Sequence, residues 1–431
     1  VAEYGITVRW NKNFLKIIRL LLERRSEFAM FGGVRFGGTL TVDDAFDMGF
    51  DHIALCMGAG RPTVIPMKNG LARGVRQASD FLMALQLTGA AKSSSLANLQ
   101  IRMPIVVIGG GLTAIDTATE SLAYYVVQVE KFLHRYEELV RHHGEAYVRS
   151  RWVGDEAEVA EEFLAHGRAI RAERAAAAQQ GRAPRLVDLL NQWGGATIAY
   201  RRRLIDSPSY TLNHEEISKA FEEGIRFAEL LSPLEVEVDE FGAARALKLQ
   251  KLALNPDSGK IAPTEETVVL PARSILVAAG TQPNTVLARE DDRNVRIDGR
   301  YFQALDEEGQ PAKPEPIAKP QEVRVLMSLR PDGRAMSFFG DLHPSFAGNV
   351  VKAMGSAKQG YPVVSRVLAR TPATDPSPAE LTARLNDELR TTVHEVIRLT
   401  PNIVEVVVRA PIAARAFRPG QFYRLQNFET L

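Results

Sequence analysis

The stretch "MPIVVIGGGLTAIDTATE", residues 103–120, decides the fold class that the sequence predicts. Residues 105–108 are apolar and β-branched, and this short run favours a buried parallel strand over a helix. Gly109, Gly111 and Ala114 then fit the G-x-G-x-x-G/A pattern. Glycines at this spacing allow a sharp turn and let backbone N–H groups approach a pyrophosphate. The stretch therefore predicts a nucleotide-binding turn.

A helical pattern over residues 113–123 supports the same prediction. A helix that begins beside the glycines directs the partial positive charge of its N-terminus toward bound phosphates. A glycine triplet alone is also typical of an ordinary turn, so the prediction depends on the order strand, glycines, helix.

Length and composition fit a globular chain of two or three domains. The 431 residues are 45% hydrophobic and 24% charged, and the formal net charge is +1. This balance does not favour nucleic-acid binding, and we find no apolar run of about 18 residues that would predict a membrane span. Because no signal peptide is visible, we expect a cytoplasmic protein. The single cysteine, Cys56, lies in the apolar run "HIALCMGAG" and is expected to be buried.

Three further apolar stretches end at glycine in a similar way. They are "FDHIALCMGAG" (50–60), "SILVAAGTQPN" (274–284) and "AMSFFGDLHP" (335–344). One glycine can simply end a strand, but four such stretches in one chain favour the carboxyl ends of parallel strands. Ligands bind at that edge in α/β folds.

A fifth stretch, "ATIAYRRR", ends in Arg201, Arg202 and Arg203. A site for NAD usually has an acidic residue at the end of this strand, where it binds the ribose 2′-OH. Arginines there can bind the 2′-phosphate of NADP instead, because they are always charged and can contact it bidentately. A solvated basic strand end is the alternative interpretation.

The order of these motifs resembles the flavoproteins with two dinucleotide-binding domains, above all the small subunit of glutamate synthase and the flavin half of dihydropyrimidine dehydrogenase. The resemblance covers about residues 1–370, with insertions. It implies an α/β fold with two Rossmann-like domains, in which an NADP-binding domain is inserted in an FAD-binding domain. The family's Fe–S cysteines and its FAD pyrophosphate fingerprint would precede Val1, so this stretch alone is expected to bind FAD poorly.

A second resemblance concerns the carboxyl-terminal end. A Pro-, Ser- and Thr-rich stretch precedes alternating apolar and polar residues, and "RPGQFYRL" (418–425) resembles the opening of a ferredoxin–NADP reductase-like β-barrel. There Tyr423, Arg424 and Leu425 would approach a flavin. The predicted domains are 1–98 (FAD-binding, first part), 99–288 (NADP-binding, with a helical insertion at about 128–193), 289–370 (FAD-binding, second part), 371–385 (linker) and 386–431 (start of the small barrel).

The resemblance also assigns individual residues. Asp341 in "FFGD" would bind the FAD ribitol, and the helix from Asn349 would direct its N-terminus at the flavin, whereas an N-capping role for Asp341 is the alternative. Asp116 would serve helix-end packing. We predict no catalytic acid or base and no metal site. The predicted cofactor-binding residues are Gly58, Gly60, Gly109, Gly110, Gly111, Thr113, Ala114, Asp116, Arg201, Arg202, Gly280, Gly340, Asp341, Asn349 and Val350.

The sequence thus predicts an FAD-dependent NADPH oxidoreductase. Electrons would pass from NADPH through the flavin to a redox partner protein or domain, for which an iron–sulfur centre is one option. Two alternatives remain open: a non-catalytic nucleotide-binding scaffold, and an NAD(P)-dependent dehydrogenase without flavin.

Overall fold

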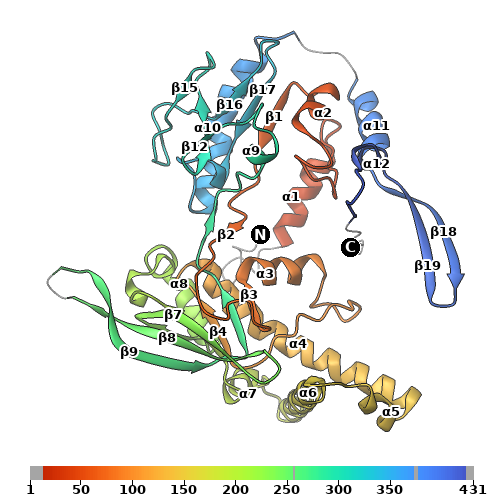
Figure 1. Cartoon of the computed structure of the whole chain (residues 1–431), viewed down its shortest axis with the longest axis vertical. Helices are drawn as coiled ribbons and strands as arrows, with labels where there is room; N and C mark the ends of the chain where they lie inside the picture. Colours follow the sequence, from red (N-terminus) through yellow and green to blue (C-terminus); the bar gives the residue numbers. More distant parts are fainter. Residues whose placement is uncertain (1–12, 256–257, 373–376, 424–431) are drawn as a thin grey trace. The chain divides into compact units, whose positions relative to one another are not determined.

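The computed structural model describes residues 13–255, 258–372 and 377–423 (Figure 1). Its contacts divide these residues into two compact units. The first unit holds residues 62–280, and the second unit holds residues 13–61 together with the described residues from 281 onward. No helix of the described residues is both long and apolar enough to cross a membrane.

The first unit is built on a five-stranded sheet in which all four neighbouring pairs are parallel. Every residue of the two strands at 105–108 and 274–277 is buried, because central strands of a parallel sheet are covered on both faces. The strand predicted at 105–108 and the α/β fold class are confirmed. The strands lie in the order β3 (Val75–Gln77), β10 (Ser274–Val277), β4 (Ile105–Ile108), β5 (Ala196–Tyr200) and β6 (Arg226–Glu229).

The two faces of this sheet are covered differently. Ile105 and Val107 pack in a core with helical side chains, whereas Val106 and Ile108 pack against an antiparallel sheet. This alternation follows from the two-residue period of a strand. The helices of the first core are α3 (Ala78–Leu87), α4 (Leu112–His143) and α8 (Pro208–Glu222), and the antiparallel sheet has strands β7 (Leu231–Val238), β8 (Ala244–Leu254) and β9 (Ile261–Pro271).

Helix α4 extends well beyond the predicted range of 113–123. It continues for 32 residues because no glycine or proline interrupts it before Gly144, which has a φ of +82°. The predicted insertion therefore begins inside this helix and continues in α5 (Glu145–Ser150), α6 (Glu156–Gln179) and α7 (Leu186–Gln192). Figure 1 shows α6 beside α4, and the two helices are in contact. A short 3₁₀ helix, η2 (Leu204–Asp206), follows β5.

Residues 62–98 belong to the first unit by their contacts. The sequence assigned them to the first part of an FAD-binding domain, but strand β3 pairs with β10 and helix α3 contacts α4. The functional assignment of the domains stays a prediction.

The second unit has a mixed sheet in the order β1 (His52–Leu55), β17 (Ala335–Phe338), β16 (Leu326–Leu329), β14 (Ala304–Leu305) and β15 (Pro311–Ala312). Only the pair β1–β17 is parallel among these strands. The prediction that Cys56 is buried is wrong: its side chain is exposed, because β1 ends at Leu55 and the chain leaves the sheet there. The remaining elements of this part are α1 (Asn13–Glu23), α2 (Val42–Asp47), β2 (Arg61–Pro62), β11 (Thr281–Gln282), α9 (Leu287–Glu290), β12 (Ile297–Asp298), β13 (Tyr301–Phe302), η3 (Gly340–Leu342) and α10 (Val350–Leu368).

The linker predicted at 371–385 is in part a helix, α11 (Pro378–Leu389). Ser377 and Glu380 form a capping box, and Pro378 occupies the first turn, so the Pro- and Ser-rich stretch starts a helix. Strands β18 (Thr392–Thr400) and β19 (Ile403–Arg409) then form an antiparallel hairpin, followed by α12 (Pro411–Ala416). The barrel stays a prediction, and Arg424 and Leu425 of its proposed flavin contact lie outside the described residues.

Candidate nucleotide-binding site

The glycine turn lies between β4 and α4, at the carboxyl edge of the parallel sheet. Gly109 has a φ of +153°, and a Cβ atom there would lie 2.3 Å from the carbonyl oxygen of Ala278. A Cβ atom on Gly110 would lie 2.3 Å from the ring of Tyr200. These two glycines are therefore required by the packing of the turn against β10 and β5.

Gly111 differs from its two neighbours, because no atom of a described residue other than its chain neighbours lies within 4 Å of the position that its Cβ would take. It is the N-cap residue of α4, and no side chain caps this helix end. Thr113 and Ala114 belong to the first turn of the helix, and Ala114 is buried. Open space beside an uncapped helix N-terminus is the arrangement that accommodates a phosphate group.

A second helix end holds the glycine turn in place. The Oγ of Ser209 donates a hydrogen bond of 2.9 Å to the carbonyl oxygen of Gly110. Ser207 lies 3.0 Å away, oxygen to oxygen, and caps α8 by accepting from the backbone N–H of Tyr210. The sequence analysis did not identify these serines, although "SPS" with a proline in the first turn is a recognisable helix start.

A pocket of about 790 Å³ lies beyond the end of β5. Arg201 and Arg202 line it and are exposed, and neither forms an ion pair with any carboxylate in the described part of the chain. Arg203 instead contacts Asp206 with two hydrogen bonds of 2.7 and 3.0 Å, and its guanidinium lowers the pKa of that carboxyl. Lys260, which precedes β9, also lines the pocket.

The charges of this pocket favour an anion. Because Arg203 and Asp206 compensate one another, the positive charge that remains comes from Arg201, Arg202 and Lys260. Lys260 was missed by the sequence analysis, since its approach to the arginines depends on the pairing of β8 with β9.

Asp116 is fully buried within α4 and does not line the pocket described above. It lies in the second turn of this helix, and its helix-end packing role stays a prediction. The other predicted residue of this unit, Gly280, has a φ of +89° and open space at its Cβ position. It follows β10, the strand beside β4.

In the second unit, Gly58 and Gly340 follow the parallel neighbours β1 and β17. Their φ angles are +66° and +65°, and Gly58 has open space at its Cβ position. The nearest neighbour of a Cβ atom on Gly60 would be the amide nitrogen of Asn284, at 3.8 Å. These glycines therefore lie at the carboxyl edge of the two parallel strands.

The Oδ1 atom of Asp341 accepts a hydrogen bond of 2.8 Å from the backbone N–H of Gly348. It does not cap α10, because Asn349 is the N-cap residue and accepts from the N–H of Lys352 at 2.9 Å. Val350 is the first residue of that helix. The carboxylate of Asp341 thus orders the loop that leads into α10.

The described residues define a mixed α/β protein with a Rossmann-like first unit. Along the sheet the order β6, β5, β4, β10 matches the doubly wound order 3-2-1-4, and the glycine turn follows the first strand of that series.

Comparison with known proteins shows which of them this chain is similar to. No protein-family model matches the chain. An uncharacterized protein of Rickettsia prowazekii is 35% identical over 440 residues, which cover 99% of this chain and 53% of the relative. The chain therefore spans about half the length of the curated relative that it matches.

Two solved structures show low similarity to this chain. FprA of Mycobacterium tuberculosis in complex with NADPH is 14% identical with a TM-score of 0.47, over 89% of this chain and 79% of that protein. Thioredoxin reductase of Lactococcus lactis is 14% identical with a TM-score of 0.36, over 74% of this chain and 66% of that protein.

Proposed function

We propose that the first unit binds NADPH and that the chain is part of an FAD-dependent oxidoreductase, which passes electrons from NADPH to a partner redox centre. The observation that carries this proposal is the open space at Gly111 beside the uncapped N-terminus of α4. A pyrophosphate there would accept hydrogen bonds from backbone N–H groups and lie at the positive end of a 32-residue helix.

The choice of NADPH over NADH rests on the end of β5. Arg201 and Arg202 supply charges that no carboxylate of the described residues pairs with, and Lys260 adds a third positive charge to the lining of the pocket. Among the described residues, the acidic residue that lines this pocket is Asp206, and it is already held by Arg203. A 2′-phosphate therefore finds cationic partners here, whereas a free 2′-OH finds no unpaired carboxylate to bind.

The second unit supplies the residues for FAD. Gly58 leaves room at the carboxyl end of β1, Gly340 follows the parallel neighbour β17, and the loop ordered by Asp341 leads into α10. When they are bound, nicotinamide and flavin supply hydride transfer, so the chain itself needs only to bind and orient them. This role fits the carboxyl edges of the strands in the two units, where glycines, arginines and helix ends lie.

Calorimetric titration of the chain with NADPH and NADH tests the nucleotide part of the proposal. We expect one equivalent of NADPH to bind at least about tenfold more tightly than NADH, which corresponds to about 1.4 kcal/mol. Equal affinities would overturn the assignment of the arginine pocket to the 2′-phosphate.

A second assay tests the flavin part. NADPH oxidation by an artificial electron acceptor is recorded without FAD and with FAD in large excess, because weak FAD binding is expected for this chain. We expect oxidation only with FAD. Oxidation without FAD would indicate a flavin-free dehydrogenase, and tight NADPH binding with no oxidation under either condition would indicate a scaffold.

A further inference from the structure

A second hollow, of about 350 Å³, lies at the opposite edge of the same parallel sheet. Three arginines of its lining, Arg73, Arg102 and Arg273, come shortly before β3, β4 and β10, so they lie at the amino ends of these strands. The glycine turn lies at the carboxyl ends, which separates the hollow from the candidate nucleotide site.

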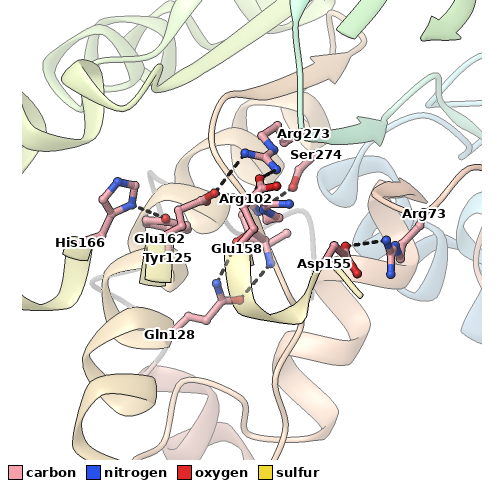
Figure 2. Close-up of polar contacts among 11 residues, drawn as sticks. Arg73, Arg102, Tyr125, Gln128, Asp155, Glu158, Glu162, His166, Arg273 and Ser274 are labelled. Atoms are coloured by element: carbon pink, nitrogen blue, oxygen red, sulfur yellow. Dashed lines mark hydrogen bonds and ion pairs between the residues drawn. The ribbon is translucent and has the colours of Figure 1, made fainter. Parts of the chain in front are cut away.

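The inserted helix α6 covers this edge through a network of charges (Figure 2). Arg102 contacts Glu162 at 2.5 Å and Glu158 at 3.1 Å, and Arg273 contacts the same two carboxylates. Arg73 contacts Asp155 at 2.6 Å. The charges of this network compensate one another, since three arginines pair with three carboxylates.

Backbone hydrogen bonds of Arg102 and of the preceding residue hold this part of the chain in place. Its backbone N–H donates to Ser274 at 2.8 Å, and the side chain of Gln128 bonds both backbone groups of Ile101. Tyr125 and His166, 2.6 Å apart, join α4 to α6 in the same region. The wall of the hollow is therefore held by several hydrogen bonds that join the sheet edge to the insertion.

Two donors of this wall are not used within the described residues. Arg76 lines the hollow and forms no ion pair there. The Nε of Arg102 has no hydrogen-bond partner, although this residue is only 9% exposed. This Nε is buried from solvent, so Arg76 rather than Arg102 offers free donors to a ligand in the hollow.

The first turn of α6 limits how much negative charge a ligand can carry in the hollow. Asp155, Glu156 and Val159 line the hollow, and no side chain caps the N-terminus of this 24-residue helix. The partial positive charge of a helix end favours an anion, but the two carboxylates beside it disfavour a strongly charged one.

Apart from Asn98 and Gln100, the rest of the lining is apolar. Phe132, Trp152 and Phe163 contribute rings, and Val159 and Ala160 contribute aliphatic surface. A pocket with an apolar wall and a few convergent polar groups is typical of small-molecule sites. Its volume lies near the lower end of the range of about 300–1,000 Å³ for such sites, which excludes a dinucleotide.

We propose that this hollow binds a small monoanion with a flat apolar body, of the aryl carboxylate class. The carboxylate would face Arg76 and the N-terminus of α6, and the ring would lie against Trp152 and the two phenylalanines. Arg73, Arg102 and Arg273 would hold the wall in place through their ion pairs. The proposal does not depend on the function of the nucleotide site.

Benzoate tests the proposal directly, with neutral benzamide and inorganic phosphate as matched probes. We expect saturable binding of benzoate to the whole chain by calorimetry, with a Kd below about 1 mM and a change in tryptophan fluorescence. Benzamide and phosphate should each bind at least about tenfold more weakly. NADPH should not compete. Equal binding of benzoate and benzamide, no saturation by benzoate, or displacement by NADPH would each overturn the proposal.

Variants assign the binding to this hollow. Arg76→Gln should weaken benzoate at least about tenfold, whereas Arg168→Gln, which changes an exposed arginine of α6 outside the hollow, should leave it unchanged. If Arg76→Gln does not fold, Ala243→Phe fills part of the hollow from the start of β8 and should abolish binding. Wild-type affinity in either folded variant would contradict the proposed site.

Discussion

Replacing Arg201 and Arg202 together by glutamine should weaken the binding of NADPH and leave that of NADH nearly unchanged. The two nucleotides differ only in the 2′-phosphate, and these two arginines line the pocket without an ion pair to a described carboxylate. Their removal therefore takes away charge that only NADPH uses. The fold should be retained, because both side chains are exposed.

The magnitude follows from the exposure of the two side chains. A charge-assisted hydrogen bond contributes roughly 1.5–3 kcal/mol, and exposure to solvent places each arginine near or below the lower limit, at about 1–1.5 kcal/mol. Since 1.4 kcal/mol is a factor of ten, the loss of both arginines should raise the Kd for NADPH about 30–140-fold. The Kd for NADH should change less than about threefold.

Calorimetric titration at fixed ionic strength measures both constants. The control is the double variant Arg203→Gln/Asp206→Asn, which removes a compensated pair from the same pocket and leaves its net charge unchanged. This control should change the Kd for NADPH by only a small factor. Equal losses for NADPH and NADH in the Arg201/Arg202 variant, or an equally large loss in the control, would refute the assignment.

Three further predictions concern the glycine turn and pH. Gly111→Val should abolish NADPH binding with unchanged circular dichroism, because the branched side chain fills open space beside α4; unchanged affinity would contradict this. Gly109→Ala should instead lower the free energy of unfolding by about 1–3 kcal/mol in urea, because its Cβ would meet Ala278; wild-type stability would be inconsistent with that contact. Burial lowers the pKa of His343 to about 4, so the unfolded chain takes up the proton at higher pH than the folded one. His343 should contribute a loss on the order of 2–3 kcal/mol as pH falls from about 6.5 toward 4, and His343→Gln should remove this part of the pH dependence in thermal unfolding, whereas the part due to His52, whose pKa burial also lowers to about 4, should remain.

The strands of the two parallel pairs could be predicted, because the signal for each strand lies in its own residues and in the glycine that follows. Ile105–Ile108 is apolar at every position, as a strand covered on both faces requires, and the glycine that follows ends it. The four stretches that end at glycine form two pairs of parallel neighbours, β4 with β10 and β1 with β17.

The role of each glycine could not be predicted, because it depends on neighbours that are distant in sequence. Gly109 and Gly110 are required by Ala278 and Tyr200, whereas Gly111 faces open space, yet all three look alike in the motif. Only packing separates the glycines that the fold needs from the one that leaves room for a ligand.

The insertion was recognised by composition, but its contacts were not. Glu158 and Glu162 lie one helical turn apart, which shows a shared face of α6. Their partners Arg102 and Arg273 are brought together by the pairing of β4 with β10, and no local signal reveals that pairing. The exposed Cys56 has a similar cause, since β1 ends at Leu55 whereas the apolar run continues to Met57.

A crystal structure of the chain with NADP⁺ tests the central claim most directly, because it locates the two phosphate positions independently. We predict the pyrophosphate at Gly111 beside the N-terminus of α4, and the 2′-phosphate in contact with Arg201 and Arg202. A nucleotide bound elsewhere, or one whose 2′-phosphate points away from these arginines, would contradict the account.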